Sequence, residues 1–196
     1  MTHIDYTLYL VTDRSVMSAK SLEQAVEQAI QGGCTVVQLR EKYASSREFF
    51  ETAQRVKQIT DSYHIPLIIN DRTDICLAVN AAGIHIGQQD LPAKIVRSMV
   101  GPDKIIGVSA ATLSEAIQAE QDGADYLGVG AMFATSTKTN TRPVTIERLT
   151  QIKQAVQIPV VAIGGIQSSN AATLTKTGID GIAVVSAILA QENITH

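Results

Sequence analysis

Short runs of aliphatic and β-branched residues alternate with helical patterns along the whole 196-residue chain. Most of these runs are apolar on both alternating faces, which is typical of parallel strands buried on both sides of a sheet. The expected strands are residues 7–12, 34–40, 66–70, 83–87, 104–109, 125–130, 159–165 and 181–186. An alternating strand and helix pattern predicts a parallel sheet with helices packed against it.

The segments between the runs carry helix-start and helix-end signals. Ser45 with Glu48, and Thr112 with Glu115, form the Ser/Thr-x-x-Glu pattern of a capping box. A glycine that ends a helix and is followed by a strand recurs in GGCTVVQLR, AAGIHIG, DGADYLGVG and TGIDGIAVVS. This repetition indicates one supersecondary unit used many times.

Eight such units in one chain favour a closed (β/α)8 barrel, a TIM barrel, over an open doubly wound sheet. No linker, low-complexity run or charge block divides the sequence, so we expect a single barrel domain over residues 1–196. The last helical segment, AILAQENITH at 187–196, is brief. We therefore expect a short or truncated eighth helix.

Charge and composition narrow the classes of partner. The formal net charge of −3 gives no bulk attraction to nucleic acid. The longest apolar run, around 158–166, is too short to cross a bilayer, and the N-terminus lacks the basic region of a signal peptide. Cys34 and Cys76 lie in apolar segments outside any CxxC pair, which indicates reduced core cysteines. We expect a cytoplasmic protein with no nucleic-acid or membrane partner, and a homo-oligomer is left open.

Polar residues gather where the expected strands end. In (β/α)8 barrels the active site lies at the C-terminal ends of the strands. In strand order, from the second to the eighth, the residues there are Gln38, Arg40, Glu41 and Lys42; Asn70 and Asp71; His85, Gln88, Gln89 and Asp90; Ser109; Thr135, Ser136, Thr137 and Lys138; Gly164 and Gly165; and Ser186.

Two groups of strand-end residues suit anions. Gly164 and Gly165 follow the seventh strand and Ser186 follows the eighth, where such barrels usually bind phosphate, although the glycines could also serve only a tight turn. On the other side of the barrel, Arg40 and Lys42 together with Lys138 could hold a polyanion. The alternative for the arginine and the lysine is a surface salt bridge.

Asp71 and Asp90 follow neighbouring strands. Two carboxylates beside a polyphosphate site suggest Mg²⁺, which takes one or two carboxylates plus phosphate and water oxygens. The alternative is that they cap the helices expected at 72–80 and 91–99. His85 lies between two isoleucines, where a structural role is the more common one. The sequence lacks the patterns of acyl-transfer and dinucleotide chemistry.

The loop GAMFATSTKTNTRP, residues 130–143, is longer than the usual connection of about 2–6 residues. It is rich in threonine and carries one lysine and one arginine. Its length and position after the sixth strand suggest a lid that reaches over the barrel mouth between the two anion sites.

Seven segments, in this order, resemble the thiamine-phosphate synthase family: QLREK (38–42), IIND (68–71), GIHIGQQD (83–90), GVSAAT (107–112), TSTK (135–138), AIGGI (162–166) and VVSAI (184–188). The family joins 4-amino-2-methyl-5-(diphosphooxymethyl)pyrimidine to a thiazole ethyl phosphate, with thiamine phosphate and pyrophosphate as products. The resemblance implies a dissociative, Mg²⁺-assisted reaction in which pyrophosphate leaves first and the thiazole nitrogen then captures a pyrimidine methyl cation.

The resemblance also implies roles for individual residues. Arg40, Lys42, Ser109 and Lys138 would be catalytic, and Asp71 and Asp90 would carry Mg²⁺. The implied substrate-binding residues, beyond those catalytic ones, are Gln38, Leu39, Glu41 and Asn70 for the pyrimidine diphosphate, Thr135, Ser136 and Thr137 for the thiazole, and Gly165, Val185 and Ser186 for its phosphate.

Three residues depart from the family pattern. Ala111 stands where the family commonly has histidine, and Ala131 and Ala134 stand where the loop usually has proline. Because proline restricts the free chain, we expect a more mobile loop.

The alternatives to a thiamine-phosphate synthase are a thiazole tautomerase, a sugar-phosphate epimerase, and a non-catalytic barrel that binds a phosphate ligand. A tautomerase would need no diphosphate and metal site. A sugar-phosphate epimerase would need a metal or an acid/base pair next to a carbon acid, which the sequence does not show.

Overall fold

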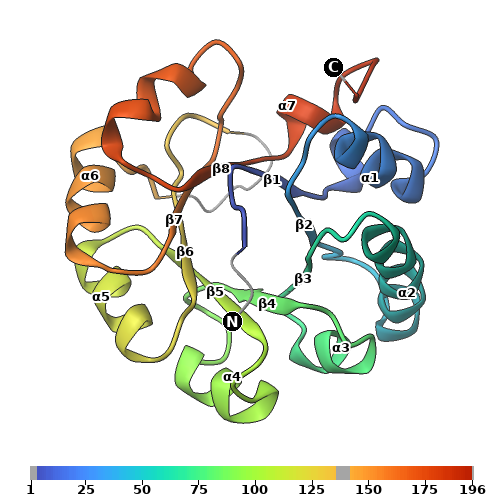
Figure 1. The fold of residues 1–196 in the computed structure, drawn as a ribbon, viewed down its shortest axis with the longest axis horizontal. Coiled ribbons are helices and arrows are strands. Elements are labelled where there is room, and N and C mark those ends of the chain that lie inside the picture. Colours follow the sequence, from blue (N-terminus) through green and yellow to red (C-terminus); the bar gives the residue numbers. More distant parts are fainter. Residues whose placement is uncertain (1–3, 136–141, 196) are drawn as a thin grey trace.

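Parallel strands pair side by side and close into a barrel, with β1 hydrogen-bonded to both β2 and β8 (Figure 1). The computed structural model describes residues 4–135 and 142–195 of the chain. The strands are β1 (Leu8–Val11), β2 (Val36–Leu39), β3 (Leu67–Asn70), β4 (Gly83–Ile86), β5 (Ile105–Ala110), β6 (Tyr126–Val129), β7 (Val160–Ile163) and β8 (Gly181–Val184). The predicted (β/α)8 fold is confirmed.

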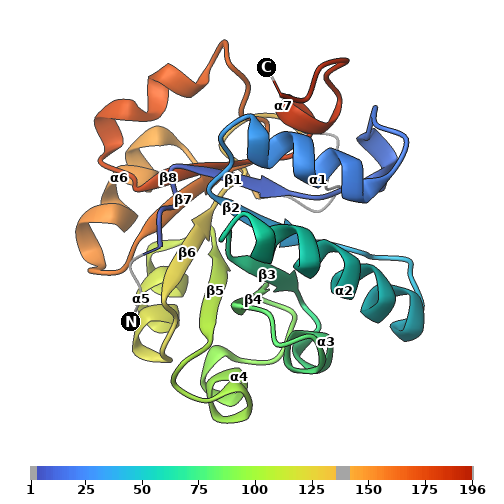
Figure 2. The same cartoon turned by 45° about the vertical axis from the view of Figure 1, so that its right-hand side comes forward.

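Helices form a ring around the barrel (Figures 1 and 2). They are η1 (Arg14–Val16), α1 (Leu22–Gln31), α2 (Ser46–Ser62), α3 (Thr73–Ala78), α4 (Ala93–Val100), α5 (Leu113–Gln121), α6 (Ile146–Ala155), η2 (Ala171–Thr177) and α7 (Ser186–Leu189). Both predicted capping boxes are present, at the starts of α2 and α5. The eighth helix, α7, is a single turn, as the brief segment at 187–196 suggests.

The alternation of side chains along each strand separates two apolar layers. Outward-facing residues pack with the helices in a large core, and inward-facing ones fill the barrel in a smaller cluster that includes Tyr9, Val36, Ile68 and Tyr126. A strand buried on both faces therefore reads as a continuous apolar run, which is why the sequence pattern located every strand. None of the helices in residues 4–135 and 142–195 is long and apolar enough to cross a membrane.

The observed strands are mostly shorter than expected. The run at 34–40, for example, gives a strand only at Val36–Leu39, because pairing stops where the chain turns toward the next helix. After β7 the chain forms the 3-10 helix η2 rather than a full α-helix. These shorter strands leave the polar residues that follow them in loops at one end of the barrel.

Candidate active site

The C-terminal ends of the strands surround a cavity of about 660 Å³. Most of the predicted site residues lie in its wall: Gln38, Arg40, Lys42, Asn70, Asp71, Asp90, Ser109, Thr135, Gly165, Val185 and Ser186. They come from seven different strand ends, so residues far apart in the sequence meet in one place. Ser136, Thr137 and Lys138 lie outside the described residues, together with the rest of the middle of the expected lid, residues 136–141.

Two of the predicted residues do not line the cavity. The side chain of Leu39 is fully buried in the apolar layer between sheet and helices. The carboxylate of Glu41 accepts a hydrogen bond from Arg14 Nε at 2.7 Å. Successive side chains on a strand point to opposite faces, so an inward Gln38 and Arg40 require the residue between them to point outward. The QLREK motif thus combines residues of both faces.

Each basic side chain in the described cavity wall has an acidic partner. Arg40 Nη1 lies 2.9 Å from Asp13 Oδ2, and Lys42 pairs with the carboxylate of Asp71. Arg142 Nη1 and Nη2 lie 2.7 and 2.9 Å from the two carboxylate oxygens of Glu115. The salt bridges considered for Arg40 and Lys42 therefore exist, but they belong to the cavity wall and not to the outer surface.

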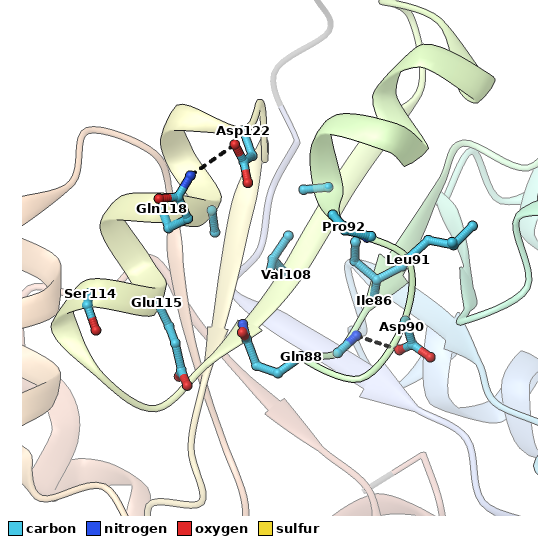
Figure 3. Close-up of a pocket in the computed structure, with 13 residues that line it drawn as sticks. Ile86, Gln88, Asp90, Leu91, Pro92, Val108, Ser114, Glu115, Gln118 and Asp122 are labelled. Carbon is cyan, nitrogen blue, oxygen red and sulfur yellow. Dashed lines mark hydrogen bonds between the residues drawn. The ribbon is translucent and has the colours of Figure 1, made fainter.

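The helix-capping alternative for the two aspartates is wrong. The N-cap of α3 is Arg72 and that of α4 is Pro92, and neither helix has a side-chain cap. Asp71 instead adopts a left-handed backbone with φ 61°, and its amide donates to the carbonyl of His85 at 2.9 Å. Asp90 Oδ2 turns back to accept from the Gly87 amide at 2.7 Å (Figure 3).

The surroundings of Asp90 disfavour the charged form of its carboxyl group. Burial, and to a smaller degree the nearby charge of Asp71, raise the pKa of its carboxyl above the ordinary value. Among the described residues it forms no ion pair, whereas Asp71 pairs with Lys42. Two adjacent carboxylates with one uncompensated charge suit a hard divalent cation such as Mg²⁺. Among the described residues, no three or more His, Cys, Asp or Glu side chains are grouped so that they could hold a metal ion, so most ligands of such a cation would come from phosphate and water.

The opposite end of the cavity offers backbone donors. The amides of Gly165, Val185 and Ser186 make no hydrogen bond to any described residue, although all three residues line the cavity. Unpaired amides that converge at strand ends form a ready site for a phosphate group. The cavity therefore has amides without a partner among the described residues at the position where the sequence predicts a phosphate site, and phosphate binding there stays a prediction.

The pair Gly164 and Gly165 also has a structural reason. Both have positive φ, 101° and 64°, and a Cβ on Gly165 would lie 2.4 Å from the carbonyl oxygen of Ala134. The amide of Phe133 donates to the carbonyl of Gly164 at 2.9 Å. The glycines thus let the loop after β6 pack directly on the end of β7, beside the free amides.

The start of this loop is well held although its prolines are absent. The Ala131 amide donates to the Arg142 carbonyl at 3.0 Å, and the Val144 amide donates to the Ala131 carbonyl at 2.9 Å. These bonds tie the two described ends of the loop together. The expected greater mobility concerns the segment between them and stays a prediction, because residues 136–141 lie outside the described part of the chain.

The cavity wall contains residues that the sequence did not indicate. Asp13 follows β1 as the other polar residues follow their strands, and the same signal could have found it. Arg142 was visible only as a basic residue in a long loop. Tyr9 and Tyr126 lie inside apolar strands, where a tyrosine usually indicates core packing, and their position in the cavity floor depends on the barrel geometry.

His85 has the structural surroundings that its sequence position suggests. Its Nδ1 lies 2.9 Å from the hydroxyl of Tyr126, and its Nε2 lies 2.9 Å from Ser109 Oγ. Both ring nitrogens are thus engaged with the cavity floor. The histidine supports Ser109, which is itself one of the predicted site residues.

A second, smaller pocket of about 450 Å³ lies next to the cavity, between α4 and α5 (Figure 3). It shares Gly87, Gln88, Asp90 and Glu115 with the main cavity. Gln88 Nε2 donates to the carbonyl of Ser109 at 2.7 Å, so this side chain holds the loop after β4 against β5.

Comparison with known proteins agrees with this geometry. Residues 8–188 match the family described as thiamine monophosphate synthase. The thiamine-phosphate synthase of Ruminiclostridium cellulolyticum is 63% identical over 97% of this chain and 91% of its own length, and that of Clostridium tetani is 59% identical over 98% and 92%. Among solved structures, thiamine phosphate pyrophosphorylase from Pyrococcus furiosus superposes with a TM-score of 0.90 at 41% identity, over 97% of this chain and 91% of that one.

Proposed function

The chain belongs to the thiamine monophosphate synthase family and is a transferase, and from this premise we propose which substrates it joins and how. The substrates are 4-amino-2-methyl-5-(diphosphooxymethyl)pyrimidine and 4-methyl-5-(2-phosphooxyethyl)thiazole, or the 2-carboxy form of the latter with loss of CO₂. The products are thiamine phosphate and pyrophosphate. The observation that carries this proposal is a cavity with an anion site at each end, one built from charged side chains and one from free amides.

The two anion sites lie on opposite sides of the barrel. Arg40, Lys42, Asp71 and Asp90 follow β2, β3 and β4, whereas the free amides follow β7 and β8. In a closed ring of eight strands, β3 faces β7 across the axis. A reaction between one diphosphate ester and one phosphate ester needs this separation, because the reacting centre must lie between the two anionic ends.

The diphosphate end would exchange partners when substrate binds. Mg²⁺ held by Asp71 and Asp90 would supply charge neutralisation of the leaving group. With the Asp71 charge so engaged, the ammonium group of Lys42 becomes available for a phosphate oxygen. Arg40 keeps Asp13 on Nη1 and has further N–H donors for the diphosphate, and Lys138 is assigned to the same end.

The reaction then proceeds in two steps. The bond between the methylene carbon and the diphosphate oxygen breaks first, and its electron pair leaves with pyrophosphate. The lone pair of the thiazole nitrogen forms the new C–N bond with the pyrimidinylmethyl cation. Arg40, Lys42 and Lys138 stabilise the leaving charge, and Gln38, Asn70 and Ser109 hold the pyrimidine. The step requires no protein nucleophile.

The thiazole end depends on neutral donors. The amides of Gly165, Val185 and Ser186 bind the phosphate monoester, and the family resemblance assigns Thr135, Ser136 and Thr137 to the thiazole. A thiazole tautomerase would use this end alone, so the charged groups at the other end, Arg40 with Asp13 and Asp71 with Asp90, favour the synthase.

A cytoplasmic location is part of the proposal and is supported by two buried cysteines that form no disulfide, Cys34 and Cys76.

The deciding experiment is incubation with both substrates and Mg²⁺, with pyrophosphate and thiamine phosphate measured together. We expect equal amounts of the two products and neither when one substrate is omitted. A folded protein that makes no thiamine phosphate with either thiazole form would refute the synthase assignment. Interconversion of the thiazole isomers without pyrimidine would instead establish the tautomerase.

Asp71→Asn with Asp74→Asn as its control tests the charged end. Asparagine tolerates the left-handed backbone at position 71, so the fold should survive while turnover falls by about 100-fold or more. Asp74 is a nearby exposed aspartate that pairs with Arg72 outside the cavity. Its substitution should leave kcat and KM unchanged. If the loss of folded protein in Asp71→Asn accounts for the whole loss of turnover, Asp71 has no role in the reaction.

A further inference from the structure

A chain of hydrogen bonds crosses the floor of the cavity from β2 to β5. Gln38 Nε2 donates to the hydroxyl of Tyr9 at 2.9 Å, and the hydroxyls of Tyr9 and Tyr126 lie 2.7 Å apart. The hydroxyl of Tyr126 lies 2.9 Å from Nδ1 of His85, whose Nε2 lies 2.9 Å from Ser109 Oγ. The chain joins two residues that the proposed function assigns to the pyrimidine.

Donor and acceptor chemistry gives this chain one direction. An amide nitrogen only donates, so the Tyr9 oxygen accepts from Gln38. The oxygen of Tyr126 is the one acceptor among the described residues within reach of the Tyr9 proton, so we take Tyr9 as the donor in this pair. Tyr126 must then donate to Nδ1 of His85. A histidine that accepts at Nδ1 carries its proton on Nε2, which donates to Ser109.

The direction determines what each end offers to a ligand. Because Ser109 Oγ accepts from His85, its own proton remains available to a ligand in the cavity that Ser109 lines. The carboxamide oxygen of Gln38 has no hydrogen-bond partner among the described residues, and within that part of the chain no fully buried side-chain oxygen or nitrogen lacks a partner. This oxygen is therefore open to the cavity that Gln38 lines. The floor presents an acceptor at one end and a donor at the other.

The two phenols are held in place and keep their protons. Tyr9 is 1% exposed and Tyr126 is 0% exposed. Burial raises the pKa of both hydroxyls well above the ordinary value, so neither ionises near neutral pH. The ring of Tyr126 occupies the space that a side chain at Gly107 would need, since a Cβ there would lie 2.1 Å from Tyr126 Cζ.

We propose that Tyr9 and Tyr126 are positioning residues that fix the direction of this chain, so that the floor selects a 4-aminopyrimidine over its 4-oxo counterpart. The identity of the ligand rests on the proposed function. A 4-amino group donates and the ring nitrogens accept, which matches an acceptor at Gln38 and a donor at Ser109. A 4-oxo ring carries a carbonyl acceptor and an N–H donor instead, so both contacts would be mismatched.

The test compares Tyr9→Phe and Tyr126→Phe with Tyr6→Phe. Tyr6 stacks on Tyr126 at a centroid distance of 4.8 Å, yet its hydroxyl forms no hydrogen bond to a described residue and it does not line the cavity. The same substitution there controls for lost packing. The probes are the 4-amino and 4-oxo forms of 2-methyl-5-(phosphooxymethyl)pyrimidine, which lack the diphosphate leaving group and act as competitive inhibitors.

We expect the native protein to bind the 4-amino probe at least about 100-fold more tightly than the 4-oxo probe. In Tyr9→Phe and Tyr126→Phe this ratio should fall by about 10-fold or more. Without a fixed direction of the chain, Gln38 and Ser109 no longer discriminate by hydrogen bonding between the two rings, and one such bond is enough for a change of this size. KM for the pyrimidine diphosphate should rise while KM for the thiazole phosphate stays unchanged. An unchanged ratio in both variants, or an equal fall in Tyr6→Phe, would overturn the proposal.

A measurement on the native protein covers the case in which these variants do not fold. Nitrogen-15 NMR of labelled histidine should show His85 neutral, with the proton on Nε2, and His85→Gln identifies its signals. A proton on Nδ1 would reverse the chain and overturn the proposal. If the native protein makes no thiamine phosphate, the proposed function fails independently of this result, which depends only on the hydrogen-bond chain.

Discussion

At the scale of single residues, the charged groups of the cavity nearly cancel. Arg40, Lys42 and Arg142 each have a carboxylate partner, and Asp90 is the acidic residue left over in the described wall. A protein gains nothing in stability from holding an unpaired carboxylate beside a second one. Such a residue is explained by a ligand that brings positive charge.

Asp90→Asn should therefore make the metal-free protein more stable and less active. The amide keeps an oxygen for the Gly87 N–H and removes the charge that faces Asp71. In EDTA we expect a higher melting temperature than for the native protein, and in Mg²⁺ a turnover lower by about 100-fold or more. Asp103→Asn, on an exposed aspartate, should change neither quantity. A metal-free Asp90→Asn that melts below the native protein would contradict this account.

Strand alternation explains which site residues the sequence could identify. Gln38 and Arg40 are two positions apart and both line the cavity, and the same rule should have removed Leu39, which a contiguous motif had included. Tyr9 and Tyr126 were missed because a tyrosine in an apolar strand looks the same whether it ends in a core or in a cavity floor. Only the closed barrel brings their hydroxyls within 2.7 Å.

At the scale of elements, Glu115 connects a helix start to a loop. It is the third helical residue of α5 and completes the capping box with Thr112. The same carboxylate binds both terminal nitrogens of Arg142, whose carbonyl accepts from Ala131 at the other end of the loop after β6. The start of α5 thus helps to hold a loop that borders the cavity.

Glu115→Gln and Glu115→Ala should separate these two roles. Glutamine keeps an oxygen for the cap and loses the charge, so we expect a loss of at most about 1 kcal/mol, and alanine should cost about 1 kcal/mol more. Glu48→Gln is the matched control, because Glu48 completes the capping box of α2 without an ion pair to a described residue. Denaturant unfolding measures all three. Equal losses in Glu48→Gln and Glu115→Gln would show that Arg142 adds nothing.

The Glu115 contribution should also depend on pH. Burial tends to raise the pKa of Glu115, but Arg142 and the amide of Ala111 outweigh it and lower the pKa below the ordinary value of 4.5. A lowered folded-state pKa gives stability that is present above the unfolded value and is lost as the pH falls through the folded one. The difference between the native protein and Glu115→Gln should therefore be constant at neutral pH and shrink in acid. A difference that grows in acid would contradict the sign.

Element boundaries were less predictable than element existence. Every strand was found because double-sided burial leaves a continuous apolar run, but the runs extend past the point where pairing stops. The segment after β7 shows the second limit. The alternation of strands and helices predicted a helix there, and the chain forms only the 3-10 helix η2.

At the scale of the whole molecule, closure of the barrel creates the distance between the two anion sites. No local pattern records that β1 pairs with β8, and the prediction of a closed barrel came only from the number of units. Closure places the β2–β4 loops and the β7–β8 loops across one cavity. In the proposed function, two anions then bind at once with the reacting atoms between them.

Separate sites predict that two ligands stabilise the protein independently. A ligand that binds only the folded state adds about 2.7 kcal/mol at a concentration one hundred times its dissociation constant. Pyrophosphate with Mg²⁺, and the thiazole phosphate alone, should each raise the melting temperature, and together their effects should add. Thermal unfolding with each ligand and with both measures this directly.

Variants at each end assign the two effects. Asp71→Asn should abolish the shift caused by pyrophosphate with Mg²⁺ and keep that of the thiazole phosphate, because only the first depends on the carboxylates. Ser186→Ala keeps the free amide after β8 but removes the hydroxyl beside it, whose oxygen accepts from Gln167 Nε2 at 3.4 Å and whose proton remains for a phosphate oxygen. This variant should reduce the thiazole phosphate shift alone. If one ligand cancels the effect of the other, the two compete for a single site. A cavity that binds only one anion at a time could not align the two substrates, and the arrangement of β3 opposite β7 would need another explanation.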